Sequence, residues 1–160
     1  MIIIAEKING SIPSVGKAIE AGDADFIRNL AKVQSEAGAD FIDVCASVEV
    51  SRELETLKWM IDIVQEATDT PIAVDSPSAE TCAKAIDFCK RPGLVNSVSM
   101  EGNKIATVFP KIARTDWQCA ALLCDDTGIP RSAEKRLEVL EALMQKAKEY
   151  NIDPSRLHID

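Results

Sequence analysis

Residues 72–97 read IAVDSPSAETCAKAIDFCKRPGLVNS, and they contain two short apolar runs separated by a longer, more polar segment. The runs at 72–75 and 94–97 each begin with consecutive apolar residues, which is typical of strands buried on both faces of a parallel sheet. A strand with one face in water would instead alternate apolar and polar residues. The segment between the runs is long enough for a crossover helix, so the stretch predicts a βαβ unit.

The same alternation continues on both sides of this unit. Apolar, β-branched runs recur at intervals that each leave room for a helix, and no linker or low-complexity stretch interrupts them. The sequence therefore predicts an α/β fold of successive βα units in one domain that spans residues 1–160. The other four predicted strands are 2–5, 41–45, 119–123 and 157–160.

The segments between the strands carry apolar residues at helical spacing. The last of them is the clearest, because it opens after Pro130 with Ser132 as a suitable N-cap. We expect one helix in each gap, with weaker patterns near 79–89 and 103–115, the latter broken at Pro110. The apolar stripes are Phe26, Ile27, Leu30 and Val33 in the first gap, Leu54, Leu57, Ile61 and Val64 in the second, and Leu137, Leu140, Leu143, Met144 and Ala147 in the last.

Periodicity alone leaves two architectures open, a closed barrel and an open doubly wound sheet. In both, the carboxyl ends of the strands face the active site, so polar residues at those ends are candidate site residues. Nearly every predicted strand has them. They are Glu6, Lys7 and Asn9 after the first strand, Asp43 and Ser47 on the second, Asp75 and Ser76 on the third, Asn96, Ser97 and Ser99 on the fourth, Asp125 and Asp126 after the fifth, and Asp160 on the sixth.

Such a lining is rich in carboxylates and amides and poor in cations, which suits a neutral, polyfunctional heterocycle. A carboxylate accepts two donors side by side, and an amide offers both a donor and an acceptor, so together they match an aminopyrimidine edge. Asp75, Asn96 and Asp160 are the residues we expect to do this jointly. The alternative for any one of them is a role as a helix N-cap or a strand-terminating residue, which is common for Asp, Asn and Ser.

Composition and motifs exclude several other functions. The formal net charge is −8, which argues against a nucleic-acid partner. No apolar run is long enough for a membrane span and the N-terminus does not resemble a signal peptide, so we expect a cytoplasmic protein. Five cysteines without a Cys-x-x-Cys pair and a single histidine, His158, predict reduced thiols, no metal site and no His-based triad. The sequence also lacks phosphate-loop, dinucleotide and nucleophile-elbow motifs.

An ordered set of short motifs runs along the whole chain: IAEKING at 4–10, AVDS at 73–76, VNS at 95–97, DTGIP at 126–130 and HID at 158–160. In this set the chain resembles the methyltetrahydrofolate:corrinoid protein methyltransferases of the pterin-binding TIM-barrel superfamily. The resemblance implies a (β/α)₈ barrel, of which this chain covers about the first six strands. It also implies that residues 1–160 are a methyltransferase domain truncated at its C-terminal end.

The same resemblance implies an activity and a site. Enzymes of this kind transfer a methyl group between N5 of tetrahydrofolate and the cobalt of a corrinoid protein, in acetogenic one-carbon metabolism or O-demethylation. Folate is then the substrate, the corrinoid is carried by a partner protein, and the enzyme is a homodimer. Asp75, Asn96 and Asp160 match the residues that anchor the pterin, and Asp43 and Ser97 complete the predicted folate-binding set. The family's asparagine that polarises N5 belongs to a seventh strand, beyond residue 160.

Two alternatives remain beside this reading. One is a dihydropteroate synthase-like enzyme with the same pterin pocket, and the other is a folate-binding fragment without catalytic activity. The IAEKING opening favours the methyltransferase. The second strand departs from the family pattern, because Asp43–Ser47 stands where the family tends to have an asparagine.

Overall fold

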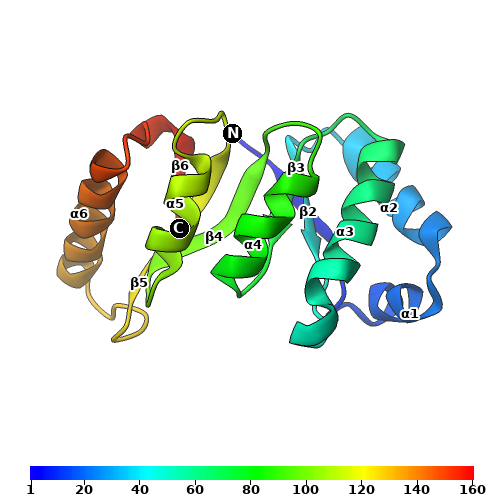
Figure 1. Cartoon of the computed structure of the whole chain (residues 1–160), viewed down its shortest axis with the longest axis horizontal. Coiled ribbons are helices and arrows are strands. Elements are labelled where there is room, and N and C mark those ends of the chain that lie inside the picture. Colours follow the sequence, from blue (N-terminus) through cyan, green and yellow to red (C-terminus); the bar gives the residue numbers. More distant parts are fainter.

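In the computed structural model, which describes residues 1–160, the chain forms six parallel strands hydrogen-bonded in sequential order from β1 to β6 (Figure 1). The six predicted strands are all present, although their bounds differ at several ends. The strands are β1 (Ile4–Asn9), β2 (Phe41–Cys45), β3 (Ile72–Asp75), β4 (Leu94–Met100), β5 (Gln118–Asp125) and β6 (Leu157–Ile159).

Helices occupy every connection between consecutive strands. The first connection holds two helices instead of the single one that the sequence predicted, because a nine-residue helix that begins with a proline precedes the predicted stripe. The helices are α1 (Pro13–Ala21), α2 (Ala24–Glu36), α3 (Val50–Ala67), α4 (Ala79–Ala85), α5 (Lys104–Ile112) and α6 (Ala133–Glu149), with short 3₁₀ turns η1 (Ile86–Phe88) and η2 (Pro154–Arg156).

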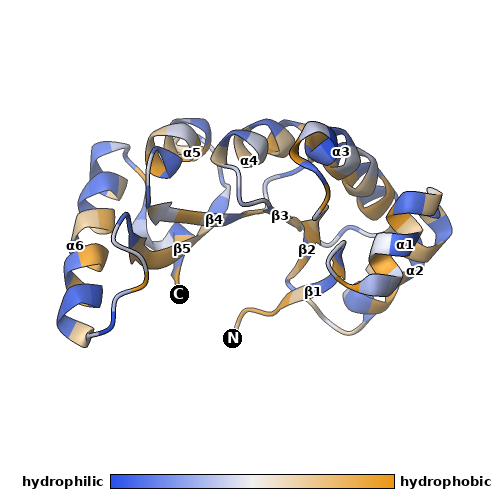
Figure 2. Ribbon diagram, turned by 90° about the horizontal axis from the view of Figure 1, so that it is seen from below, coloured by the Kyte–Doolittle hydropathy of each residue, from blue (hydrophilic) through white to orange (hydrophobic).

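The sheet is strongly curved, and all the helices lie on its convex side (Figure 2). A doubly wound sheet would have helices on both faces and a reversal of strand order, and this chain has neither. Sequential parallel strands with helices outside are the arrangement of a (β/α) barrel. The sheet does not close on itself, since β1 and β6 are its two edges.

The main core fills the space between the sheet and the helices. Outward-facing strand residues such as Ile42 and Val74 pack there with helix residues such as Leu57. A second, smaller apolar cluster of Phe41, Ala73 and Leu94 lies on the other side of the same strands. Because side chains alternate along a strand, the residue two positions after each member of this cluster also points to the concave inner face.

Several helix details differ from the sequence prediction. Val33 and Leu137, both placed in apolar stripes, are 62% and 58% exposed. Helix α5 runs through Pro110 and ends two residues later, at Ile112, so the helix is shorter than the predicted 103–115 but does not break at the proline itself. A proline in the last turn lacks one N–H and costs only one helical bond near an end that frays anyway. The predicted N-cap is confirmed, because Ser132 accepts a hydrogen bond from the Lys135 amide.

Candidate functional site

Four polar side chains from four adjacent strands form a cluster on the inner face. Asp43 on β2 and Asn96 on β4 are joined by a hydrogen bond from Asn96 Nδ2 to Asp43 Oδ2 of 2.8 Å. Asp75 is on β3, the strand between them, and it is paired in register with Asn96 on β4 and with Cys45 on β2. Glu6 on β1 acts electrostatically on both aspartates. We call Glu6, Asp43, Asp75 and Asn96 the inner polar cluster.

Burial makes the two aspartates of this cluster poor acids. Asp43 is 1% exposed, and burial raises the pKa of its carboxyl to about 7. The hydrogen bond from Asn96 lowers this pKa, whereas the charges of Asp75 and Glu6 raise it further. Burial also raises the pKa of Asp75. Near neutral pH the Asp43 carboxyl is therefore present in both its protonated and its ionised form.

Neither Asp160 nor Ser97 is hydrogen-bonded to a residue of this cluster. Asp160 follows β6, its backbone pairs with Ala121 and Leu123, and β5 lies between it and Asn96. Its exposed carboxylate makes no hydrogen bond and lines a pocket of about 320 Å³ at the end of β5. Ser97 is half-buried, and its hydroxyl also has no partner. Of the predicted substrate-binding residues, Asp43, Asp75 and Asn96 are therefore the ones that the structure brings together.

Comparison with known proteins identifies the family. The sequence profile described as "Pterin binding enzyme" matches residues 8–160. The chain belongs to the pterin-binding enzymes. It is 51% identical over its full length to a methylcorrinoid:tetrahydrofolate methyltransferase of Eubacterium limosum, of which it covers 60%. It is 23% identical to a methionine synthase of Mycobacterium leprae, with all of this chain and 14% of that protein covered.

Solved structures agree with the fold of a pterin-binding enzyme. The chain superposes on a dihydropteroate synthase from Xanthomonas albilineans in complex with 7,8-dihydropteroate, with a TM-score of 0.65 and 21% identity. That alignment covers 99% of this chain and 58% of the other. The chain thus spans about 60% of the methyltransferase that it matches and 58% of the synthase. None of its helices is long and apolar enough to cross a membrane.

Other strand-end residues of this pterin-binding enzyme hold the fold together. The Ser76 hydroxyl, buried at the end of β3, donates to Glu53 Oε1 on α3 at 2.7 Å. The Ser99 hydroxyl donates to Glu101 Oε2 at 2.6 Å. This hydrogen bond and the one from Lys104 lower the pKa of Glu101 to about 2. The structure gives these two serines a structural role, since their hydrogen bonds are made to neighbouring helix and loop residues.

Three further predicted residues hold loops at the same end of the sheet. Asp125 accepts hydrogen bonds from the amide and hydroxyl of Thr127, and Asp126 accepts one from the Gly102 amide at 2.7 Å. The Ser47 hydroxyl donates to Asn9 Oδ1 at 3.1 Å, which joins the ends of β1 and β2. The Asp126 and Ser47 bonds each join two neighbouring strand-end segments, whereas the Asp125 bonds stabilise a single loop.

Sequence reasoning missed the buried polar residues on the helices, of which Glu53 and Gln34 make hydrogen bonds to other elements. Glu53 on α3 accepts hydrogen bonds from Ser76 and from Thr81 on α4, at 2.7 and 3.1 Å. Gln34 on α2 accepts one from the backbone amide of Lys7 at 2.8 Å. Nothing in their local sequence separates them from exposed glutamate and glutamine on other helices, so only the tertiary structure reveals them.

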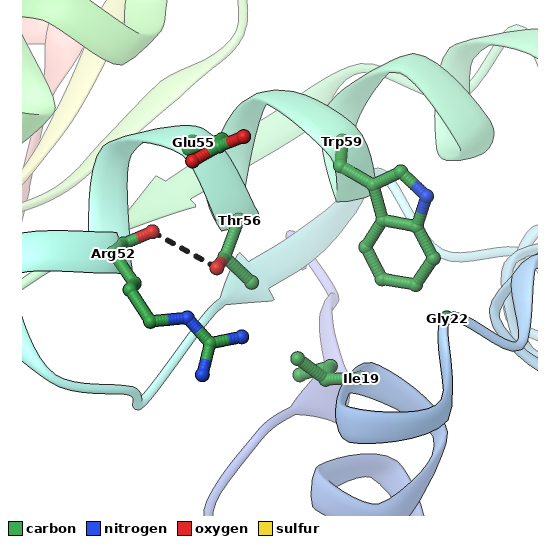
Figure 3. Close-up of a pocket in the computed structure, with 6 residues that line it drawn as sticks. All are labelled: Ile19, Gly22, Arg52, Glu55, Thr56 and Trp59. Atoms are coloured by element: carbon green, nitrogen blue, oxygen red, sulfur yellow. Dashed lines mark hydrogen bonds between the residues drawn. The ribbon is translucent and has the colours of Figure 1, made fainter.

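A separate pocket of about 410 Å³ lies outside the sheet, between α1 and α3 (Figure 3). Trp59 and Ile19 form its apolar side, and the Arg52 guanidinium points into it. Glu55 at the rim adds one carboxylate to this one cation, so the lining does not define a single class of ligand. It shares no residue with the inner polar cluster, which remains the candidate pterin site.

Proposed function

We propose that this pterin-binding enzyme holds tetrahydrofolate at the inner polar cluster and transfers a methyl group between N5 of the folate and the cobalt of a corrinoid carried by a partner protein. The observation that carries the proposal is the 51% identity over the whole chain to a protein named methylcorrinoid:tetrahydrofolate methyltransferase. The likeness to dihydropteroate synthase, at 21% identity, supports the fold alone.

The chemistry of the cluster fits the aminopyrimidine edge of a pterin. An ionised Asp75 accepts two hydrogen bonds side by side, as the amino group and the ring N–H of a pterin offer them. Asn96 gives one amide hydrogen to Asp43, which leaves its other amide hydrogen and its oxygen for the ligand. We propose that Asp160 and Ser97 extend this site from its β6 side and from the end of β4, respectively.

Asp43 suits the proton chemistry of methyl transfer at N5. When N5 gains a methyl group from the corrinoid it releases one proton, and when it loses the methyl group it takes one up. A carboxyl whose pKa is raised to about 7 by burial serves in either direction near neutral pH. Hydrogen-bond contact with Asn96 holds this carboxyl beside the residue that we propose binds the pterin ring.

Replacing Asp75 or Asn96 by alanine is expected to weaken folate binding. Each change leaves buried ligand groups without a partner, so we expect a loss of about 1–3 kcal/mol, or roughly 5- to 150-fold in Kd. Isothermal titration with tetrahydrofolate and methyltetrahydrofolate measures it, with folding checked by circular dichroism. Asp87→Ala, an exposed carboxylate on the outer layer, is the matched control. Unchanged affinity in both folded variants would refute the site assignment.

Transfer itself is tested by mixing the protein with tetrahydrofolate and a methylated corrinoid, either free methylcobalamin or a methylated corrinoid protein. We expect methyltetrahydrofolate to form, with loss of the methylcorrinoid absorption. Folate binding without transfer by the full chain would favour the non-catalytic alternative. Formation of dihydropteroate from a pterin pyrophosphate and 4-aminobenzoate would favour the synthase. Homodimerisation stays a prediction, which sedimentation of the purified protein tests.

A further inference from the structure

Strand β1 contains a bulge directly opposite Asp43. Ala5 pairs with Ile42 and Ile8 pairs with Val44, so two residues of β1, Glu6 and Lys7, lie opposite the single residue Asp43 of β2. Bulges bend a strand, re-aim its side chains and occur frequently beside active sites. Here the bulge changes which face each following residue of β1 occupies.

The bulge has consequences on both faces of the sheet. Ile4, before the bulge, packs with the inner apolar cluster, whereas Ile8, after it, is fully buried in the core under the helices. An uninterrupted strand would place both on one face, because their separation is an even number of residues. The bulge therefore allows β1 to anchor in the outer core while Glu6 still acts on Asp43 inside.

Gln34 reaches this bulge from the helix layer. Its side chain is 6% exposed, and its Oε1 accepts the Lys7 N–H at 2.8 Å. Its Nε2 has no hydrogen-bond partner. A buried amide with an unpaired N–H₂ destabilises the fold, because its desolvation is not compensated by a hydrogen bond. An apolar side chain of the same shape would not have this cost. The hydrogen bond that it accepts from the Lys7 N–H is the one polar contact that this buried side chain makes.

We propose that Gln34 is a positioning residue: by accepting the Lys7 amide it fixes the β1 bulge, and through the bulge it sets Glu6 beside Asp43 in the pterin site. The importance of this role for catalysis rests on the proposed function. The geometry itself, from Gln34 to Lys7 to the bulge, is independent of any ligand. The charged groups that act on Asp43 are Glu6 from β1 and Asp75 from β3, and Asn96 from β4 is its neutral partner.

The test is the titration midpoint of Asp43 in the Gln34→Met variant of the full chain. Methionine keeps the shape but removes the acceptor, so the bulge relaxes, Glu6 moves away and water reaches the site. Each change favours the ionised carboxylate, so we expect the midpoint to fall below its value near 7. Carbon-13 NMR of labelled aspartate carboxyls measures it without any ligand, and the pH profile of tetrahydrofolate affinity is the second readout.

Gln65→Met is the matched control. Gln65 lies on α3, and its Oε1 also accepts a backbone amide at 2.9 Å, that of Lys90 in the segment before β4, and neither residue is among the groups that act on Asp43. We expect it to leave the Asp43 midpoint in place. Gln34→Glu keeps an oxygen at the acceptor position and is expected to hold the midpoint at or above the wild-type value.

An unchanged midpoint in folded Gln34→Met, or an equal shift in Gln65→Met, would overturn the proposal. If Gln34→Met does not fold, amide exchange in the unmodified protein decides instead. The Lys7 N–H must be protected, and exchange as fast as that of an exposed amide would contradict its bond to Gln34. Absence of folate binding by the wild type, with the midpoint shift still present, would remove the proposed function and leave the positioning role intact.

Discussion

Replacing Asp43 by asparagine is expected to raise the free energy of unfolding at pH 8 by roughly 2–4 kcal/mol and to leave it nearly unchanged at pH 4. The reason is the raised pKa of this carboxyl, about 7 when folded against 3.8 for an unperturbed aspartate. Between these two values the unfolded chain has lost the Asp43 proton while the folded chain still holds it. Stability therefore falls as the pH rises from about 4 to 7, and the full penalty is present above 7.

Asparagine removes this penalty because it carries no charge and keeps an oxygen for the bond from Asn96. Urea unfolding at several pH values measures the difference between the variant and the wild type. Asp87→Asn is the control, since that carboxylate is exposed beside Lys111, and it should keep the pH dependence of the wild type. A stability gain for Asp43→Asn that is equal at pH 4 and pH 8 would show that ionisation of Asp43 is not its cause.

The same variant separates stability from activity. If Asp43 moves a proton at N5, Asp43→Asn is more stable at pH 8 and yet slower in methyl transfer, because an amide neither accepts nor releases the proton. A protein that keeps a buried carboxylate at such a cost is typical of a site where function and stability compete.

The architecture was predictable because the strands are buried on both faces. Ile72 and Val74 pack in the core on the helix side, while Ala73 between them packs on the inner face, so the three residues form an apolar run without alternation. The choice between barrel and doubly wound sheet was not predictable from periodicity. It depends on which side of the sheet each helix packs, and that is set by contacts distant in sequence.

The proximity of two proposed site residues was predictable from strand ends alone. Asp75 and Asn96 share a register position on neighbouring strands, so the rule that carboxyl ends converge is enough to bring them together. It was not predictable which polar residues are used for structure. Ser76 resembles a site residue in the sequence, yet its hydroxyl binds Glu53 from a helix more than twenty residues away. Such pairings depend on the docking of helices, which local patterns do not encode.

Replacing Gly10 by alanine is expected to destabilise the protein by about 3 kcal/mol. Gly10 follows β1, and its N–H donates to the Cys45 carbonyl at 2.9 Å, so the chain passes very close to the end of β2. An added Cβ would lie 2.0 Å from the Ala46 carbonyl oxygen. Because this neighbour is backbone, relief requires the end of β2 to move away from β1, which also displaces the strand that carries Asp43.

Gly22→Ala separates this crowding from the general effect of adding a methyl group. Gly22 has a φ of +65° and open space around its Cβ position, so alanine there meets only the left-handed backbone penalty of about 1–2 kcal/mol. Both substitutions change the unfolded chain in the same way, so the difference in their urea midpoints reports the close approach of Gly10 to Ala46. We expect Gly10→Ala to be the more destabilised and also to bind tetrahydrofolate more weakly, whereas Gly22→Ala keeps its affinity. Equal losses of stability in the two variants would mean that the ends of β1 and β2 separate at little cost, and that their close approach does not set the geometry of the site.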